Sequence, residues 1–295
     1  MNYLEKYAYT PDREAIGRAL EMIASNLENT ASEQVYKDCF SMMDLTTLKT
    51  DDTPESVAKL VDKVNSFRDS YPEWPLPASI CVYPNFAAIV ASARKCDFNI
   101  TVVSACFPSS QSFLEVKLKE CELAVADGAD EVDIVLSLSK FLSGDYEAAA
   151  EEIRQIRACI DTVAGKQGRK VHLKVILETG LLRTPEKIAQ ASFLAMEAGA
   201  DFIKTSTGKT EVNATPAAAY VMCECISLYY KMTGKRIGFK PAGGISSAAD
   251  ALSYYSIVSS LLGKDWLNKE LFRFGVSRVA NSILSAVEKG TVSFF

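Results

Sequence analysis

Histidine is almost absent from this sequence of 295 residues, which contains only His172. A histidine-rich zinc site cannot be assembled from one imidazole, and a Ser-His-Asp triad would depend on that single residue. The eight cysteines show no CxxC spacing, and several lie within apolar runs, as reduced core cysteines do. The composition therefore favours chemistry that needs no metal.

Long apolar runs and blocks of basic residues are also missing. No apolar run is long enough to span a bilayer. The net charge is −5, with acidic and basic residues interspersed, so the sequence indicates no basic surface for nucleic acid. Residues 1–7 lack the basic and apolar segments of a signal peptide. We expect a cytoplasmic protein that binds neither membranes nor nucleic acid.

Short β-rich segments alternate with helical segments along most of the chain. The eight β-rich segments are residues 41–45, 79–83, 100–107, 131–136, 172–178, 202–207, 237–240 and 271–276. Helical segments between them include residues 57–67, 111–126, 146–158, 187–198, 217–230 and 248–262. Successive β-rich segments end about every 33 residues, which is the length of a βα unit. We therefore predict an α/β fold, a (β/α)₈ TIM barrel over residues 41–295, with an extra N-terminal helical segment over residues 1–40.

Four Thr-Pro pairs are predicted to begin helices. Threonine at an N-cap accepts a hydrogen bond from the first helical turn, and proline suits the first helical position. On this basis Thr10, Thr53, Thr184 and Thr215 are predicted N-cap residues.

Two lysines lie in predicted strands just before glycine-containing turns. One is Lys204, in the segment Asp-Phe-Ile-Lys-Thr-Ser-Thr-Gly-Lys, and the other is Lys240, in Gly-Phe-Lys-Pro-Ala-Gly-Gly. A buried ammonium group beside a second cation loses its proton more easily, and the free amine can form an imine with an aldehyde or ketone. Alternatively, each lysine extends to solvent at its strand end or pairs with a carboxylate.

Further charged residues alternate with apolar ones in the predicted strands. Because side chains alternate along a strand, several charged side chains are predicted to point into the barrel lumen. They are Asp44, Asp133, Lys174, Glu178, Lys204 and Lys240. Asp133 and Lys204 belong to alternate strands, so they can share one layer of the lumen. A carboxylate beside an imine can move protons directly or through water. A purely structural ion-pair network is the alternative.

Glycines follow the last three predicted strands, at Gly208, at Gly243-Gly244 and at Gly275. Exposed backbone N–H groups in these turns could bind a phosphate, a common use of the last loops of this barrel. A nucleotide P-loop is excluded, because Ile203 occupies the position where the first glycine of that motif would lie.

Eight segments of the chain match one known family: residues 43–48, 79–84, 127–135, 173–180, 201–209, 212–216, 238–244 and 272–275. In these segments the chain resembles the class I, Schiff-base deoxyribose-phosphate aldolases. The resemblance implies a (β/α)₈ barrel, no metal or other cofactor, and reversible cleavage of 2-deoxy-D-ribose 5-phosphate into acetaldehyde and D-glyceraldehyde 3-phosphate. It implies that Lys204 forms the imine, that Lys240 lowers the pKa of Lys204, and that Asp133 handles the proton.

The predicted substrate is thus a small sugar phosphate, bound near the strand ends and the glycine turns. The predicted substrate-binding residues are Asp44, Thr46, Cys81, Thr207, Gly208, Lys209, Gly243, Gly244, Gly275, Ser277 and Arg278. We also expect a homo-oligomer, specifically a dimer.

The chain departs from the family pattern at three places. Many relatives have an arginine after the double glycine, where this chain has Ile245-Ser246, and two serines after the last strand, where it has Ser277-Arg278. We therefore expect Arg278 to contact the phosphate in place of the missing arginine. Some relatives end in a tyrosine that assists proton transfer, whereas this chain ends in Phe295, which has no hydroxyl group.

Two other functions stay open on the sequence alone. The same lysine pair would serve a Schiff-base aldolase with a different carbonyl donor. A barrel that binds sugar phosphates without turnover is the second alternative, although a pure binding protein has no use for a lysine of lowered pKa.

Overall fold

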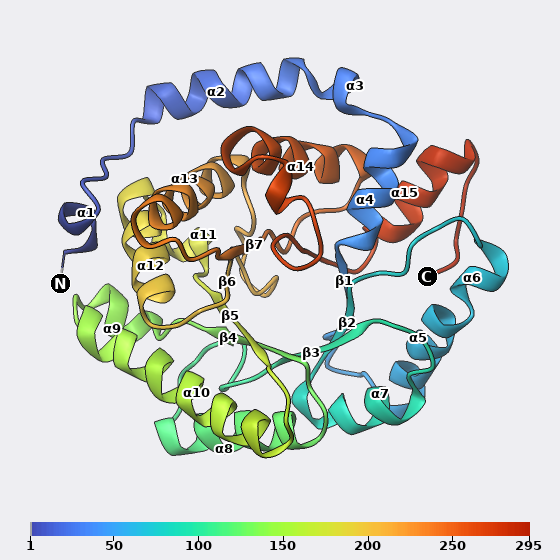
Figure 1. Cartoon of the computed structure of the whole chain (residues 1–295), viewed down its shortest axis with the longest axis horizontal. Coiled ribbons are helices and arrows are strands. Elements are labelled where there is room, and N and C mark those ends of the chain that lie inside the picture. The colour runs from blue at the N-terminus through green and yellow to red at the C-terminus, as the bar shows by residue number, and fades with distance from the viewer. Residues whose placement is uncertain (1) are drawn as a thin grey trace.

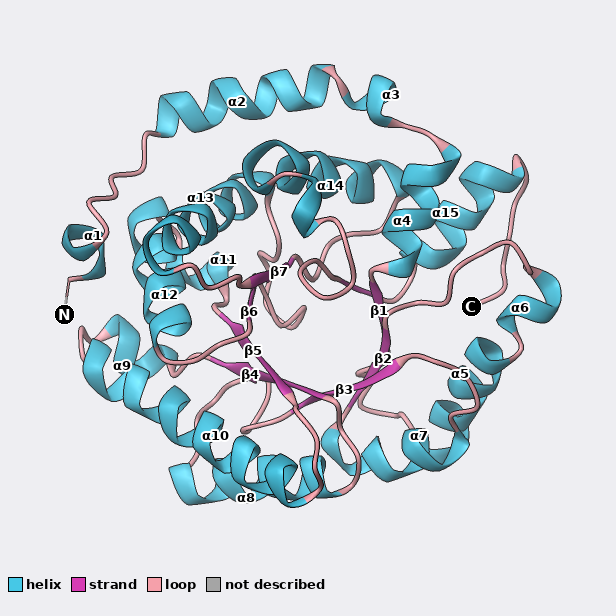
Figure 2. Ribbon diagram, in the orientation of Figure 1, coloured by secondary structure: helices cyan, strands magenta, loops and turns pink. Residues whose placement is uncertain are grey.

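Eight short parallel strands form a ring at the centre of the computed structural model, which describes residues 2–295 (Figures 1 and 2). The strands are β1 (Met43–Thr46), β2 (Ser79–Val82), β3 (Asn99–Val103), β4 (Glu131–Val135), β5 (His172–Ile176), β6 (Phe202–Lys204), β7 (Gly238–Lys240) and β8 (Phe274–Val276). Their order is β7-β6-β5-β4-β3-β2-β1-β8, and parallel bridges from Phe239 to Phe272 and from Ala242 to Gly275 bring the two ends of the sheet together. The predicted (β/α)₈ barrel is confirmed.

Helices surround the strands on all sides in Figure 2. The longer ones are α5 (Pro54–Asn65), α7 (Ala87–Ala93), α8 (Leu114–Ala126), α10 (Tyr146–Lys166), α12 (Pro185–Glu197), α13 (Pro216–Thr233), α14 (Ala248–Leu262) and α15 (Val279–Glu288). The short ones are α6 (Phe67–Ser70), η1 (Pro84–Phe86), α9 (Leu138–Leu142), α11 (Thr179–Leu182) and η2 (Lys264–Trp266). No helix within residues 2–295 has both the length and the apolar character needed to cross a membrane.

Three of the four predicted N-caps are confirmed. The side chains of Thr53, Thr184 and Thr215 each accept a hydrogen bond from the first turn of α5, α12 and α13, and a proline follows each of them. The prediction at Thr10 is wrong, because the following helix begins at Arg13. Its N-cap is Asp12, whose carboxylate accepts hydrogen bonds from two backbone N–H groups of the first turn and so takes over the capping role.

The third strand ends earlier than predicted, at Val103 instead of residue 107. Ala105 and Cys106 adopt positive φ angles of 55° and 62°, which turn the chain out of the extended conformation. The backbone N–H of Cys106 donates to the Glu120 carboxylate at 2.8 Å, and this hydrogen bond replaces one that the strand would have made.

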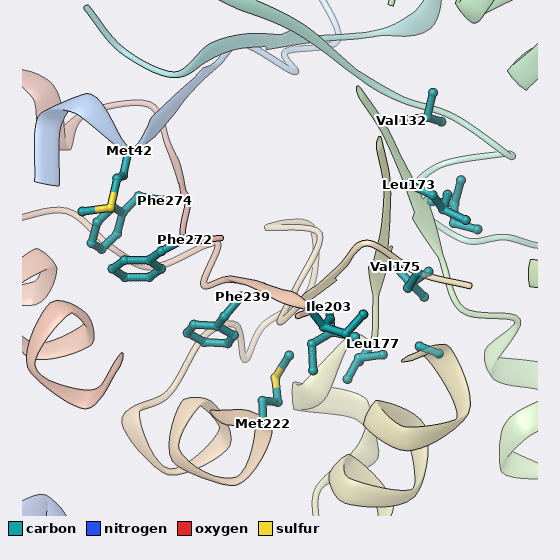
Figure 3. Close-up of a cluster of buried hydrophobic side chains, with 14 of the residues drawn as sticks. Met42, Val132, Leu173, Val175, Leu177, Ile203, Met222, Phe239, Phe272 and Phe274 are labelled. Atoms are coloured by element: carbon teal, nitrogen blue, oxygen red, sulfur yellow. The ribbon is translucent and has the colours of Figure 1, made fainter. Parts of the chain in front are cut away.

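Side chains on the outer face of the barrel are apolar and pack against the helices. Figure 3 shows this layer, in which Ile203, Phe239 and Leu177 of the strand region lie near Met222 of α13. Phe272 and Phe274 continue the same layer around β8. Because side chains alternate along a strand, the residues between these apolar positions point into the lumen. The charged strand residues occupy lumen positions, together with uncharged ones such as Thr101 and Phe202.

Four helices precede the barrel: α1 (Tyr3–Lys6), α2 (Arg13–Ser25), α3 (Leu27–Thr30) and α4 (Glu33–Ser41). The Tyr7 ring after α1 stacks on Phe193 of α12 with ring centroids 4.2 Å apart. Helix α2 lies outside the ring of helices, against α13 and α14 (Figure 1). The predicted boundary at residue 40 falls within α4, and we keep the division into an extension and a catalytic barrel as a proposal.

Candidate active site

Lys204, Lys240 and Asp133 meet in the lumen of the barrel. Strand register pairs Lys204 with Lys240 on neighbouring strands. The Nζ atoms of both lysines donate to the same oxygen, Oδ2 of Asp133, at 2.8 Å each. Lys204 is 4% exposed and Lys240 is completely buried. The structure thus brings together the three residues that were predicted to be catalytic.

A second layer of charged side chains lies against this trio. Lys174 donates to Oδ1 of Asp133 at 3.0 Å and forms an ion pair with Glu131. Arg273 donates to both carboxylate oxygens of Glu131, at 2.7 and 3.1 Å. The same guanidinium group donates to Asp44 at 2.7 Å, and Asp44 lies 2.5 Å from Nζ of Lys240. Each buried charge therefore has at least one partner of opposite sign.

Glu131 and Arg273 were not among the predicted site residues, although strand alternation carried the signal for both. Glu131 lies two residues before Asp133 on the same strand and so shares its inward face. Arg273 lies between Phe272 and Phe274, which belong to the outer apolar layer, so the arginine must point inward.

We call these seven side chains the lumen network. Its cations are Lys174, Lys204, Lys240 and Arg273, and its carboxylates are Asp44, Glu131 and Asp133. If all were ionised, the network would carry one excess positive charge. An uncompensated buried charge is costly, and loss of one proton from a lysine would balance the network.

The surroundings of the two lysines indicate that Lys204 is the one that loses its proton. Burial lowers the pKa of Lys204 and the nearby Lys240 ammonium adds to this effect, while Asp133 opposes it. Burial alone would also lower the pKa of Lys240, but Asp133 and Asp44 together outweigh it and raise that pKa above its ordinary value. Lys240 therefore stays protonated beside an amine that is more easily neutralised.

Asp133 is held in its ionised form. Burial raises the pKa of the carboxyl group, but Lys174, Lys204 and Lys240 together hold the pKa well below its usual range. A carboxylate surrounded by three ammonium groups is a weak base. It becomes a stronger one when Lys204 loses its charge.

A cavity of about 880 Å³ opens above Lys204 at the carboxyl ends of the strands. Its walls are the loops after β1, β6, β7 and β8, which we call the mouth loops, at residues 46–49, 207–209, 242–246 and 275–278. The predicted substrate-binding residues that line it are Thr46, Thr207, Gly208, Lys209, Gly243, Gly244, Gly275, Ser277 and Arg278. Asp44 and Cys81 are completely buried beneath it and do not line it.

Two glycines of the mouth loops are required by close packing. Gly243 has a φ of +78°, and a Cβ atom there would lie 2.8 Å from the Asn213 side chain. At Gly275 a Cβ atom would lie 2.7 Å from Ala242 Cβ and 3.2 Å from Lys240 Cε. The missing side chain at Gly275 therefore leaves room for the Lys240 side chain.

Glu178 holds the loop after β6 instead of joining the lysines. It was predicted in the charged lumen, but its φ of +55° turns the chain directly after β5. Its carboxylate accepts hydrogen bonds from Thr207 Oγ1 at 2.5 Å and from Thr210 Oγ1 at 3.3 Å. Lys209 fixes the same loop from the other side by donating to the Leu48 carbonyl at 2.5 Å.

Arg278 and the C-terminal residues lie at the rim of the cavity. Arg278 is exposed and has no ion-pair partner among residues 2–295. Phe295 also lines the cavity, and the backbone N–H groups of Phe294 and Phe295 donate to Oδ1 of Asn281 at 2.9 and 3.0 Å. The Phe295 ring packs beside Phe67. The tail is therefore an ordered part of the rim.

Within residues 2–295, no group of three or more His, Cys, Asp and Glu side chains is arranged to hold a metal ion. The carboxylates of the lumen network are each paired with lysine or arginine. Burial raises the pKa of the Cys81 thiol, so this side chain remains protonated beside the lysines.

Comparison with known proteins gives consistent matches. The family model described as DeoC/LacD family aldolase matches residues 39–255. The chain is 42% identical to a human protein named deoxyribose-phosphate aldolase, over 84% of this chain and 78% of that one. It is 39% identical to the protein of the same name from Agrobacterium fabrum, over 85% and 90%. The structure described as a unique tetrameric structure of deoxyribose phosphate aldolase from Aeropyrum pernix superposes with a TM-score of 0.65 and 24% identity, covering 94% of this chain and 98% of that one.

Proposed function

The chain belongs to the DeoC/LacD aldolase family, and from this premise we propose that it is a deoxyribose-phosphate aldolase acting through an imine on Lys204. The reaction is the reversible cleavage of 2-deoxy-D-ribose 5-phosphate into acetaldehyde and D-glyceraldehyde 3-phosphate, a step in the breakdown of deoxyribose phosphate. The observation that carries the proposal is the pair of lysines that share one oxygen of Asp133 below an open cavity.

Lys204 is the proposed nucleophile because it alone of the lumen lysines lines the cavity. Its free amine attacks the C1 aldehyde carbon of the open-chain sugar to give a carbinolamine. A proton added to the carbinolamine hydroxyl group lets it leave as water, and the protonated imine remains. Lys240 cannot take this role, since two carboxylates hold its proton. Lys240 instead keeps a positive charge next to Lys204 and favours the free amine.

The protonated imine accepts the electron pair of the C2–C3 bond when that bond breaks. The C3 hydroxyl group loses its proton and becomes the aldehyde of D-glyceraldehyde 3-phosphate. The remaining enamine takes up a proton at C2, and water then releases acetaldehyde and restores the free amine. The water lost when the imine forms is thus returned when it is hydrolysed.

Asp133 is the proposed carrier of these protons, directly or through water. While Lys204 is protonated, the three ammonium neighbours of Asp133 make it a weak base. Once Lys204 is uncharged in the carbinolamine, Asp133 retains only Lys174 and Lys240 and binds a proton more readily. The network then returns to its first state when the imine is hydrolysed.

The phosphate of the substrate is proposed to lie among the loops after β6, β7 and β8. Backbone N–H groups at Gly208, Gly243 and Gly244 suit an anion, since all three glycines adopt positive φ and form open turns. Arg278 and Ser277 at the rim add a cation and a hydroxyl group.

We further propose that the enzyme uses no metal or other cofactor, is cytoplasmic, and forms a homodimer. Treatment with EDTA is expected to leave the rate unchanged. A large loss that zinc restores would contradict the metal-free mechanism. Sedimentation measurements would distinguish a dimer from the tetramer described for the Aeropyrum pernix protein.

Reductive trapping tests the proposal. Acetaldehyde and borohydride are expected to leave an ethyl group on Lys204, located by mass spectrometry of peptides, and to inactivate the enzyme. Lys204→Ala should show no adduct. Trapping of a different carbonyl compound in preference to acetaldehyde would indicate an aldolase with another donor, and no adduct with any aldehyde would indicate a binding protein.

A further inference from the structure

A second cavity, of about 360 Å³, lies between the N-terminal helix α2 and the outer side of the barrel. Its walls come from α2, α11, α12, α13 and the loop before α13. None of its lining residues lines the cavity above Lys204. In Figure 1, α2 runs along α13 and α14 outside the helical ring, and it supplies one wall of this cavity through Arg13 and Ile16.

Most of the wall is apolar. Ile16 of α2, Ile188 of α12 and Val221 of α13 line the cavity, and all three are largely buried. Val212 supplies a further apolar surface that is half exposed. Small-molecule sites are typically apolar hollows of roughly 300–1,000 Å³ with a few polar groups, and this cavity is at the lower end of that range.

The polar groups of the wall are unusual because two of them lack partners. Thr179 is 3% exposed, and its Oγ1 has no hydrogen-bond partner within residues 2–295. Oδ1 of Asn213 is likewise buried without a partner, while Nδ2 of the same side chain donates to the Thr210 carbonyl at 3.0 Å. An unpaired buried polar atom is costly, and a ligand that donates a hydrogen bond would remove the cost.

A cation without a partner lies at the edge of the same cavity. Arg183 lines it and has no ion pair among residues 2–295. The other arginine of the wall, Arg13, is already engaged, since it lies 3.2 Å from the Glu186 carboxylate. Arg183 is therefore the group available to an anion.

The wall is also firmly held. The Val212 carbonyl oxygen lies so close to Gly180 that a Cβ atom there would be 2.1 Å away. The backbone N–H of Thr179 donates to the Thr205 carbonyl at 2.9 Å, which ties α11 to the chain after β6. A site whose wall is already ordered loses little entropy when it binds a ligand.

We propose that this cavity is a binding site for a small amphipathic anion, with its carboxylate or phosphate on Arg183, its apolar body against α2, α12 and α13, and a hydrogen-bond donor directed to Thr179 and Asn213. The site shares no lining residue with the cavity above Lys204, and it adjoins the mouth loops where Asn213 packs against Gly243. It gives the helices before the barrel a role in ligand binding.

Three matched probes test this proposal on the unaltered full-length protein by titration calorimetry. 4-Hydroxybenzoate carries the anion, the ring and the donor, benzoate lacks the donor, and 4-hydroxybenzyl alcohol lacks the anion. We expect 4-hydroxybenzoate to bind once per chain, and each of the other two to bind about tenfold more weakly. Equal affinities for all three, or no binding at about 1 mM probe, would overturn the proposal.

Variants assign each contact. Thr179→Val keeps the shape of the side chain and removes its hydroxyl group. It should lower the affinity for 4-hydroxybenzoate about fivefold and leave the affinity for benzoate unchanged. Arg183→Gln should lower the affinity for 4-hydroxybenzoate to that of the unaltered protein for 4-hydroxybenzyl alcohol. Lys187→Gln, an exposed change on α12 outside this cavity, is the matched control and should have no effect.

A final variant distinguishes this cavity from the aldolase site, which could also attract an anion. Arg278→Ser alters only the mouth loops and should leave the affinity for 4-hydroxybenzoate unchanged. If binding is lost in Arg278→Ser and kept in Arg183→Gln, the probe occupies the cavity above Lys204 and the proposal is wrong.

Discussion

The lumen network and the mouth loops hold their polar groups in different ways. The network is enclosed, with six of its seven side chains completely buried, and strand register fixes where its strand residues lie. The mouth loops present backbone N–H groups, Lys209 and the exposed Arg278 around an open cavity. Charges in the network act strongly on one another because little water screens them. Charges at the mouth face solvent and act mainly on what enters.

This difference assigns different tasks to the two regions. In the proposed mechanism, the network favours loss of one proton from Lys204 before the substrate arrives. Open turns and a free arginine suit a group that arrives with the substrate and leaves with the product. Changes in the network should therefore alter chemistry or stability, and changes at the mouth should alter binding.

The largest effect is expected at Lys204, where the two regions meet. Lys204→Ala should reduce the rate of cleavage by about 10⁴-fold or more, because no other amine lines the floor of the cavity. Removal of a catalytic nucleophile lowers rates by factors of this size. Folding should persist, because Asp133 keeps Lys174 and Lys240 as partners. Steady-state rates and circular dichroism measure the two outcomes.

Lys49→Ala is the matched control, because Lys49 lines the cavity without contacting the network. It should keep most of the activity. Turnover by Lys204→Ala comparable to that of Lys49→Ala would mean that the imine forms elsewhere.

Arg273 tests the network as a structural unit. Arg273→Met removes one buried cation from Glu131, which keeps Lys174, and from Asp44, which keeps Lys240. It should lower the free energy of unfolding by about 3 kcal/mol, measured in urea. The stability lost in the double variant Arg273→Met/Glu131→Gln should be less than the sum of the two single losses, because the second change removes the carboxylate that has lost its arginine partner. Additive losses would show that the two side chains do not interact.

The same pair has a predictable dependence on pH. Lys174 and Arg273 hold the pKa of Glu131 well below its ordinary value, although burial opposes them. A carboxyl group whose folded-state pKa is lowered stabilises the fold above its unfolded pKa, and this contribution is lost as the pH falls through the folded-state value. Glu131→Gln should therefore lose less stability on acidification than the unaltered protein does.

Lys240→Leu tests how the network sets the nucleophile. Without Lys240, repulsion on the Lys204 ammonium disappears and Asp133 attracts it more strongly, so the pKa of Lys204 rises. The free amine is present above that pKa, so activity at neutral pH should fall by roughly 10²-fold and recover in part under alkaline conditions. A pH–rate profile measures this. A profile that is lowered uniformly, without an alkaline shift, would contradict the role.

The same contrast explains how much could be predicted from the sequence. Strand periodicity placed Asp133, Lys174, Lys204 and Lys240 inward, and the structure brings all four together. The same rule places Arg273 inward, because Phe272 and Phe274 on either side of it belong to the outer apolar layer. Strand periodicity therefore predicts well which side chains point into the lumen, because register is a regular property of the backbone.

The loops follow no such period. Glu178 and Cys106 adopt positive φ angles that neither residue type favours, and hydrogen bonds to distant side chains hold them there. The partner of Cys106 is Glu120, 14 residues away in the sequence, and the partner of Glu178 is Thr207, 29 residues away. Local sequence could not indicate these turns, because the interactions that stabilise them form only in the folded chain.

The smallest effect is expected at Arg278, which belongs to the mouth alone. Arg278→Ser should raise KM for 2-deoxy-D-ribose 5-phosphate about tenfold and leave kcat nearly unchanged. A charged hydrogen bond to an anion is worth roughly 1.5–3 kcal/mol, and solvent around this exposed side chain reduces its contribution to the lower end of that range. Steady-state kinetics on the phosphorylated sugar measures the change.

Unphosphorylated deoxyribose gives the decisive comparison, because it lacks the group that Arg278 is expected to contact. Its KM should be the same for Arg278→Ser and the unaltered enzyme. Arg68→Ser, which removes an exposed arginine from α6 outside the cavity, controls for the general loss of positive charge. If Arg278→Ser changes KM equally for both sugars, Arg278 makes no contact with phosphate, and the anion must rely on the glycine turns and Lys209.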